Sequence, residues 1–384
     1  MTKINRYKEK WVKEQTNILF ISDAHLGHRK TPVAVTCRSI LDMVMSVSAN
    51  NKLDMLIFPG DFLDRALMMG SVEVNETMGL VGRLLVICKT KNIIVRFLEG
   101  TKLHDERQFK PVQALIDGLG YAVDIRYMDS VCVEHIPTLG IDLLYVPDEW
   151  HPDTNKTFSD CLSVITEQGK KNVDIGVMHG MFNFQIPVTD HHIPCHNETD
   201  YLHVVNAYVV IGHDHTRQHH DRIIVPGSFD RTAHGMESPK GAVLVTLNKY
   251  TENTWVFLPN KKATIYKTVK IQGQPEGDSL VSLQTTLKKL PNGSHIKLKV
   301  SKDLPCNELL AVLRRTFPML HITKETDKVK ATTSKLFSKQ TTPTYKAPVL
   351  SANTIVEEVL TLLDSKYGVP NREALTKYME AVIT

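Results

Sequence analysis

Short apolar segments recur along the first 250 residues, and each one ends in turn-forming or polar residues. They are rich in β-branched side chains, which is the pattern of buried strands. They cover residues 18–21, 55–58, 93–98, 143–146, 173–178, 208–211, 223–225 and 242–247. Helices are expected at about 33–47 and 72–88. This alternation predicts a layered α/β domain that closes near residue 258.

The chain changes character after this domain. Strand-like segments at 264–271 and 295–300 flank a helical stretch at 280–289, and a second helix is expected at 306–315. We therefore expect a small α+β domain over residues 259–328. Residues 329–352 are rich in Thr, Ser, Lys and Pro and are typical of a linker. The final segment, 353–384, shows two helical patterns whose apolar faces are too small for an independent core. They are expected to dock on a partner protein, and packing on the chain's own surface is the alternative.

Charge is distributed unevenly along the chain. Residues 1–260 carry 26 Lys and Arg against 31 Asp and Glu, whereas residues 261–346 carry 17 against 6. A basic segment beside an acidic, His-rich domain suits an enzyme that handles a polyanion. A solvated lysine-rich surface is the alternative explanation.

Other features of the sequence concern the cellular compartment. The six cysteines are far apart and form no CxxC pair, which favours a reducing compartment over a disulfide framework. No apolar run is long enough for a membrane span, and the first 15 residues lack the apolar core of a signal peptide. The expectation is a cytoplasmic protein without a membrane partner.

Potential metal ligands follow several of the expected strands. They are Asp23 and His25 in Asp-Ala-His, Asp61 in Gly-Asp, His179 in His-Gly, and His213 and His215 in Gly-His-Asp-His. In an α/β sheet the carboxyl ends of the strands are where sites form. Residues i and i+2 of an extended segment point the same way, so each close pair can serve one ion or two adjacent ions. Carboxylates with neutral imidazoles suit manganese, iron or zinc.

In this order, the motifs resemble those of the calcineurin-like metallophosphoesterase superfamily over residues 16–250. Asp23-Ala-His25-Leu26-Gly27 is similar to the opening motif of the Mre11/SbcD nucleases. The segment Pro226-Gly227-Ser228-Phe229-Asp230-Arg231 resembles their Pro-Gly-Ser-x-x-Arg stretch. The resemblance implies a sandwich of two sheets flanked by helices, a small capping domain that binds DNA, and C-terminal helices that bind a Rad50/SbcC-like ATPase.

The resemblance also implies roles for individual residues. The first of two divalent ions, Mn²⁺ before Mg²⁺, Fe²⁺ or Zn²⁺, would take Asp23, His25, Asp61 and His215. The second would take Asp61, His179 and His213. His104 is expected to be the proton donor, with Asp105 orienting its ring. Ser228 and Arg231 are candidates for phosphate contact, or else for a structural turn and salt bridge.

The segment Glu99-Gly100-Thr101-Lys102-Leu103-His104-Asp105 departs from the family pattern. It lacks the asparagine that normally serves the second ion, and His104 stands four residues after Gly100 rather than two. Thr101 or the backbone of Leu103 is expected to fill this place. The loop histidines 191 and 192 are expected to be solvent-exposed, and the alternative is that one of them replaces the asparagine or contacts the substrate. Asp64 and Arg65 are expected to order the loop after Asp61.

The expected function is that of a Mn²⁺-dependent DNA nuclease subunit, exonuclease or endonuclease, in a DNA repair or processing complex. Its expected partners are DNA and the Rad50/SbcC-like ATPase, and a homodimer is also allowed. The compact plan suits a prokaryote or a phage-infected host cell. The alternatives are a stand-alone phosphatase or phosphodiesterase on the same fold, and a catalytically impaired scaffold.

Overall fold

The structure is a computed structural model and describes residues 6–50, 52–118, 120, 123–186, 193–271, 278–300 and 307–326. The expected linker at 329–352 and the expected helices at 353–384 lie outside the described residues. Among the described residues, no helix has both the length and the apolar character that crossing a bilayer requires.

The first sheet has the strand order β12-β11-β1-β2-β3-β4. Strands β1 to β4 are parallel to one another. Strand β11 pairs antiparallel with β1, and β12 pairs antiparallel with β11. The bounds are β1 Gln15–Phe20, β2 Leu53–Pro59, β3 Ile94–Leu98, β4 Ile125–Met128, β11 Gly241–Asn248 and β12 Thr254–Pro259.

The second sheet has the order β5-β6-β7-β8-β10-β9. Strands β6, β7, β8 and β10 are parallel, and the two edge strands are antiparallel to their neighbours. The bounds are β5 Cys132–Ile136, β6 Ile141–Val146, β7 Val173–His179, β8 Val205–Gly212, β9 Gln218–His220 and β10 Ile223–Val225.

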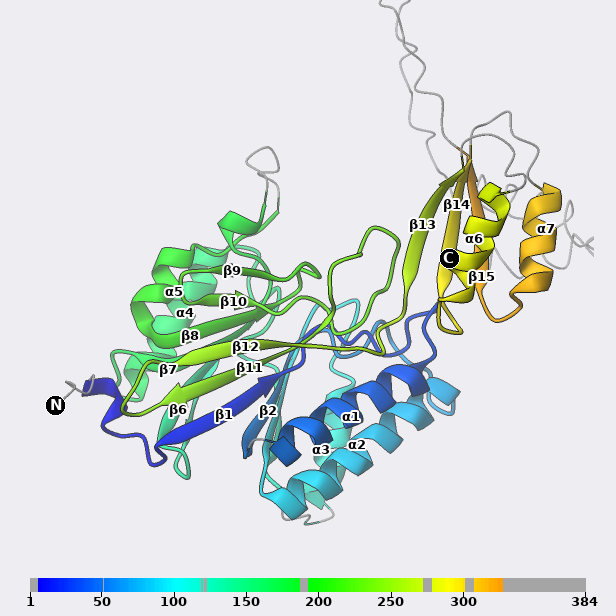
Figure 1. Ribbon diagram of the computed structural model, residues 1–384. Helices are drawn as coiled ribbons and strands as arrows, with labels where there is room; N and C mark the ends of the chain where they lie inside the picture. Colours follow the sequence, from blue (N-terminus) through cyan, green and yellow to red (C-terminus); the bar gives the residue numbers. More distant parts are fainter. Residues whose placement is uncertain are drawn as a thin grey trace, which may run out of the picture. The chain divides into compact units, whose positions relative to one another are not determined.

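Helices cover the outer face of each sheet, so the domain has four layers (Figure 1). Helices α1, α2 and α3 pack on the first sheet, and α4 and α5 pack on the second. The bounds are α1 Val33–Asn50, α2 Val72–Lys91, α3 Phe109–Gly118, α4 Thr154–Glu167 and α5 Glu198–Val204, with short 3₁₀ turns at Arg6–Lys8 and Asn183–Gln185. The prediction of a layered α/β domain is confirmed.

Side-chain alternation explains how both faces of the central strands are buried. In β2, Met55 and Ile57 enter the core between the two sheets, whereas Leu56 and Phe58 enter the core under α1 to α3. Because successive side chains of a strand point to opposite faces, a strand covered on both sides must be apolar at every position. This is why the sequence shows continuous apolar runs rather than alternating ones.

A third, three-stranded sheet follows, in the order β13-β14-β15, and its strands are all parallel. Helices α6 and α7 connect the strands and share one apolar core with them. The bounds are β13 Tyr266–Ile271, α6 Asp278–Lys288, β14 His295–Val300, α7 Asn307–Thr316 and β15 His321–Thr326. We expected an α+β unit here. It is instead of α/β type, because parallel neighbours need a crossover connection and the two helices provide it.

Candidate metal centre

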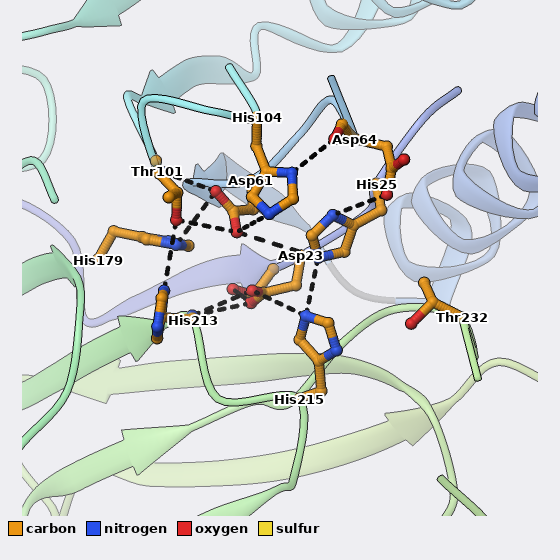
Figure 2. A network of polar contacts seen from close by, with 12 residues as sticks. Asp23, His25, Asp61, Asp64, Thr101, His104, His179, His213, His215 and Thr232 are labelled. Atoms are coloured by element: carbon orange, nitrogen blue, oxygen red, sulfur yellow. Dashed lines mark hydrogen bonds and ion pairs between the residues drawn. The ribbon is translucent and has the colours of Figure 1, made fainter. Parts of the chain in front are cut away.

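The ligand-bearing loops leave the carboxyl ends of parallel strands in both large sheets. Asp23 and His25 follow β1, Asp61 follows β2, His179 ends β7, and His213 follows β8. The loops after β1 and β2 run side by side, because the amide of Asp23 donates to Gly60 O (3.3 Å) and that of His25 donates to Asp61 O (3.1 Å). The predicted metal ligands therefore converge on one place, as Figure 2 shows.

Four of the six predicted metal ligands have a left-handed backbone conformation. Asp23, His25, Asp61 and His213 all have positive φ, at 50°, 45°, 47° and 102°. The left-handed region costs a non-glycine residue on the order of 1–2 kcal/mol. Such strain persists only where the surroundings determine the conformation, and it clusters at functional sites.

Two glycines allow the loops to come this close. A Cβ atom on Gly60 would overlap the ring of His179, and Gly60 itself has a φ of 85°. A Cβ atom on Gly100 would overlap the backbone and carboxylate of Asp61. Larger residues at these positions would separate the Asp61 carboxylate from its neighbours.

Asp23, His25 and His215 form the first group that could hold a metal ion. The Nε2 atoms of His25 and His215 are 2.8 Å apart, and His215 Nε2 is 3.8 Å from Asp23 Oδ1. The Asp23 carboxylate also accepts the amide of His213, at 3.0 and 3.2 Å. The three side chains come from two loops, so only the folded chain brings them together.

Asp61, His179 and His213 form the second group. His179 Nε2 is 3.3 Å from Asp61 Oδ1, and its Nδ1 is 2.7 Å from Pro59 O. The other oxygen of Asp61, Oδ2, is 4.0 Å from His25 Nε2 of the first group. Asp61 thus faces both groups, one oxygen toward each, which is the arrangement a bridging carboxylate requires.

The two imidazoles of the first group are in the protonation state that binds cations, whereas burial raises the pKa of the Asp23 carboxyl to about 7. Burial lowers the pKa of His25 well below its usual range, and it lowers the pKa of His215 to about 4, so both imidazoles are neutral donors at neutral pH. Burial alone would lower the pKa of His179, but Asp61 raises it well above the usual value. The same pairing holds the pKa of Asp61 below its usual range despite burial. A cation would take the place of the proton that this pair holds.

Thr101 and Asp148 lie beside the second group. Thr101 Oγ1 is 3.3 Å from Asp61 Oδ2, 3.4 Å from His213 Nδ1 and 3.1 Å from Asp148 Oδ2. Asp148 Oδ2 is also 3.6 Å from His213 Nδ1. Thr101 therefore lies beside the second group, next to Asp61 and His213. Sequence analysis missed Asp148, although an aspartate two residues after the apolar end of β6 carries the same signal as the other ligands.

His104 lies at the edge of the two groups, with its Nε2 3.9 Å from Asp61 Oδ2. Its Nδ1 is 2.6 Å from the backbone oxygen of Asp64. Asp105 instead accepts the amides of Leu63 (2.8 Å) and Gly100 (2.9 Å). The prediction that Asp105 orients the His104 ring is therefore wrong: the Asp64 carbonyl does so, and Asp105 joins the loops after β2 and β3.

Asp64 has more contacts than we expected. It helps to order its loop, since its amide donates to Leu26 O (2.9 Å). Its carboxylate is also 3.5 Å from His25 Nδ1, and Asp64, His25 and His104 form a third group within metal-binding distance of one another. This contact is electrostatic, since His25 Nδ1 has no hydrogen-bond partner among the described residues.

Ser228 and Arg231 have structural contacts. Ser228 is fully buried, and its amide donates to His215 O (3.3 Å). The Arg231 guanidinium donates to the backbone oxygens of Met236 (2.9 Å), Thr264 (3.1 Å) and Ser238 (3.3 Å). Their assignment to substrate binding is not supported by these contacts, because the hydroxyl is enclosed and the guanidinium is already committed to the backbone. The histidines at 191 and 192 lie outside the described residues.

The donor set fits a divalent cation. Two carboxylates and four imidazoles make up the first two groups, and no cysteine in the described part of the chain joins them. Comparison with protein-family models and with curated proteins gave no match for this chain. The buried His and Asp groups show that the chain could hold metal ions, and its function must be inferred from their chemistry.

Proposed function

We propose that this chain hydrolyses phosphodiester bonds with two divalent cations, Mn²⁺ first among them. The first would be held by Asp23, His25 and His215 and the second by Asp61, His179 and His213, with Asp61 between them. The observation that carries the proposal is the presence of two adjacent ligand groups with the Asp61 carboxylate between them, Oδ1 3.3 Å from His179 of the second group and Oδ2 4.0 Å from His25 of the first.

When bound, a pair of divalent cations lowers the pKa of a water molecule and stabilises charge on the phosphoryl oxygens of an in-line displacement. The chain's own contribution is to hold the donor atoms rigidly in strained loops at the ends of buried strands. In the reaction the water oxygen forms a bond to phosphorus and the bond to the leaving ester oxygen breaks. The products are a phosphomonoester and an alcohol.

His104 is placed to protonate the leaving oxygen. Its Nδ1–H donates to Asp64 O, which fixes the tautomer and leaves Nε2 facing the Asp61 carboxylate. A third of the side chain is exposed, so a substrate can reach it. A proton carried on Nε2 would pass to the departing oxygen as it separates from phosphorus.

We further propose DNA as the substrate and a Rad50/SbcC-like ATPase as the partner. The basic balance of residues 261–346 supports a polyanionic substrate. The motif resemblance supports both. A non-catalytic scaffold was an alternative because the second ion lacked its asparagine. Thr101 and Asp148 weaken that alternative, since they provide oxygen atoms at the same group.

The test is degradation of end-labelled single-stranded and duplex DNA by the full chain with Mn²⁺, with and without a coiled-coil ATPase partner. We expect cleavage that EDTA abolishes and that is lost in Asp61→Ala. It should be retained in Asp117→Ala, which removes an exposed carboxylate of α3. Hydrolysis of p-nitrophenyl phosphate without any cleavage of DNA would refute DNA as the substrate and favour a stand-alone phosphatase.

A further inference from the structure

A pocket of about 440 Å³ opens directly beside the second ligand group. We call it the Trp150 pocket. His213 of that group lines the pocket, and so do Thr101 and Asp148 beside it. The other walls include Trp150 from the loop after β6, and Gly180 and His196 from the loop after β7. Its volume lies within the range of ligand sites, about 300–1,000 Å³.

Trp150 provides an aromatic surface whose position is fixed. The residue is 36% exposed, so its ring is available to a ligand. Its indole Nε1 donates to Asp160 Oδ2 (2.8 Å), and the same oxygen is 2.9 Å from His151 Nε2. One carboxylate of α4 therefore holds both side chains. A ring held in advance loses little conformational freedom when a flat ligand stacks on it.

The inner wall of the Trp150 pocket carries a polar side chain, His196, that can bond a ligand. His196 is buried, and its Nδ1 is 3.1 Å from the Tyr201 hydroxyl. Its Nε2 has no hydrogen-bond partner within the described ranges and lies next to Gly180, where an added Cβ would come within 3.5 Å of it. Gly180, with a φ of 134°, thus leaves open the space between His196 and Asp148.

We propose that the Trp150 pocket binds the base of a nucleotide whose phosphate lies at the ligand groups. The inference rests on the proposed function, because it assumes that a phosphate binds at cations held by the two ligand groups. A flat heteroaromatic ring suits the pocket through stacking on Trp150 and hydrogen bonding to His196 Nε2. Inorganic phosphate would leave both of these groups unused, and a phosphorylated sugar lacks the flat aromatic ring that stacks on Trp150.

The test compares two probes that differ only in the base. Binding of dAMP and of 2-deoxyribose 5-phosphate to the full chain is measured by calorimetry with Mn²⁺ present. Because stacking of one base contributes on the order of a tenfold gain in affinity or more, we expect dAMP to bind roughly tenfold more tightly. Trp150→Ala should remove this difference without changing the affinity for deoxyribose phosphate. Asp160→Ala, which releases the indole, should reduce it severalfold.

The matched control is Tyr250→Ala, which removes an exposed aromatic side chain from the turn between β11 and β12 and should keep the full difference. Equal affinity for the two probes in the wild-type chain would overturn the inference. So would an equal loss of affinity for both probes in Trp150→Ala.

Hydrolysis of bis(p-nitrophenyl) phosphate, which carries no base, separates this inference from the proposed function. Turnover of that diester without any preference for dAMP would refute the pocket inference alone. The opposite result is also informative. If the chain prefers dAMP and Trp150→Ala loses this preference, but neither the diester nor DNA is hydrolysed, the proposed function is refuted and base binding in the Trp150 pocket is supported.

Discussion

Replacing Asp105 with asparagine tests how the loops of the site are held together. Both oxygens of this buried carboxylate accept backbone amides, Oδ1 that of Leu63 and Oδ2 that of Gly100. Asparagine has nearly the same shape but only one acceptor oxygen. In Asp105→Asn, one of the two buried amides must therefore face an NH₂ group.

The expected cost follows from that count of donors and acceptors. A buried donor left without a partner costs about 1–3 kcal/mol. Since each 1.4 kcal/mol is a factor of ten, local opening should become roughly 5- to 150-fold more frequent. The affected amides are those of Leu63, two residues after Asp61, and Gly100, one residue before Thr101.

Amide hydrogen exchange resolves the two loops individually. We expect at least one of the two amides to exchange faster by this factor in Asp105→Asn, and both to exchange faster in Asp105→Ala. The control is Glu106→Gln, which changes the exposed neighbouring residue. Wild-type exchange at both amides in Asp105→Asn would refute the joining role. A changed ring tautomer of His104 in the same variant, read from its ¹⁵N shifts, would instead restore the ring-orienting role.

Four further predictions concern the metal groups and the core beneath them. Asp61→Ala should lower Mn²⁺ binding to less than one ion per chain by equilibrium dialysis, because this carboxylate belongs to the second group and its Oδ2 lies 4.0 Å from His25 of the first; one or two fully retained ions would contradict the bridging position. His104→Ala should keep its Mn²⁺ but lose about 100-fold or more in kcat on DNA, the contribution of a general acid. Full activity in that variant would exclude His104 as the proton donor. Asp148→Ala should weaken the second Mn²⁺ about 10- to 100-fold in a calorimetric titration, as loss of an oxygen beside a metal site does, whereas Glu149→Gln serves as the exposed control. Phe97→Ala should reduce the free energy of unfolding by about 3–5 kcal/mol, because this buried ring stacks on Phe58 and Phe109. A loss under 1 kcal/mol in chemical denaturation would show that the aromatic cluster relaxes around the cavity.

The strands of the two large sheets were predictable where both faces are buried. Continuous apolar runs predicted β1, β2, β3, β6, β7, β8, β10 and β11. The amphipathic stretches between them predicted α1 and α2. Sequence analysis missed the strands at sheet edges, such as β5 and β12. An edge strand such as Thr254–Pro259 is only partly buried, so its composition carries a weaker signal.

The six metal-ligand candidates were likewise visible in the sequence, because local rules place them. Each follows a buried strand, and parallel strands bring their carboxyl ends to one edge of the sheet. Asp23, His25, Asp61, His179, His213 and His215 could therefore be named from residue type, strand-end position and the order of their motifs taken together. The structure brings all six into two adjacent groups.

Tertiary structure alone decided what the neighbouring residues do. Asp105 lies beside His104 in sequence, yet its oxygens bond to Leu63 and Gly100, whereas the ring of His104 bonds to Asp64. Asp148 reaches the second group from another sheet, 47 residues from Thr101. Whether a residue lies at the end of a strand can be recognised from the residues next to it in the sequence. The partners of a polar atom depend on which loops meet, and residue spacing along the chain does not contain that information.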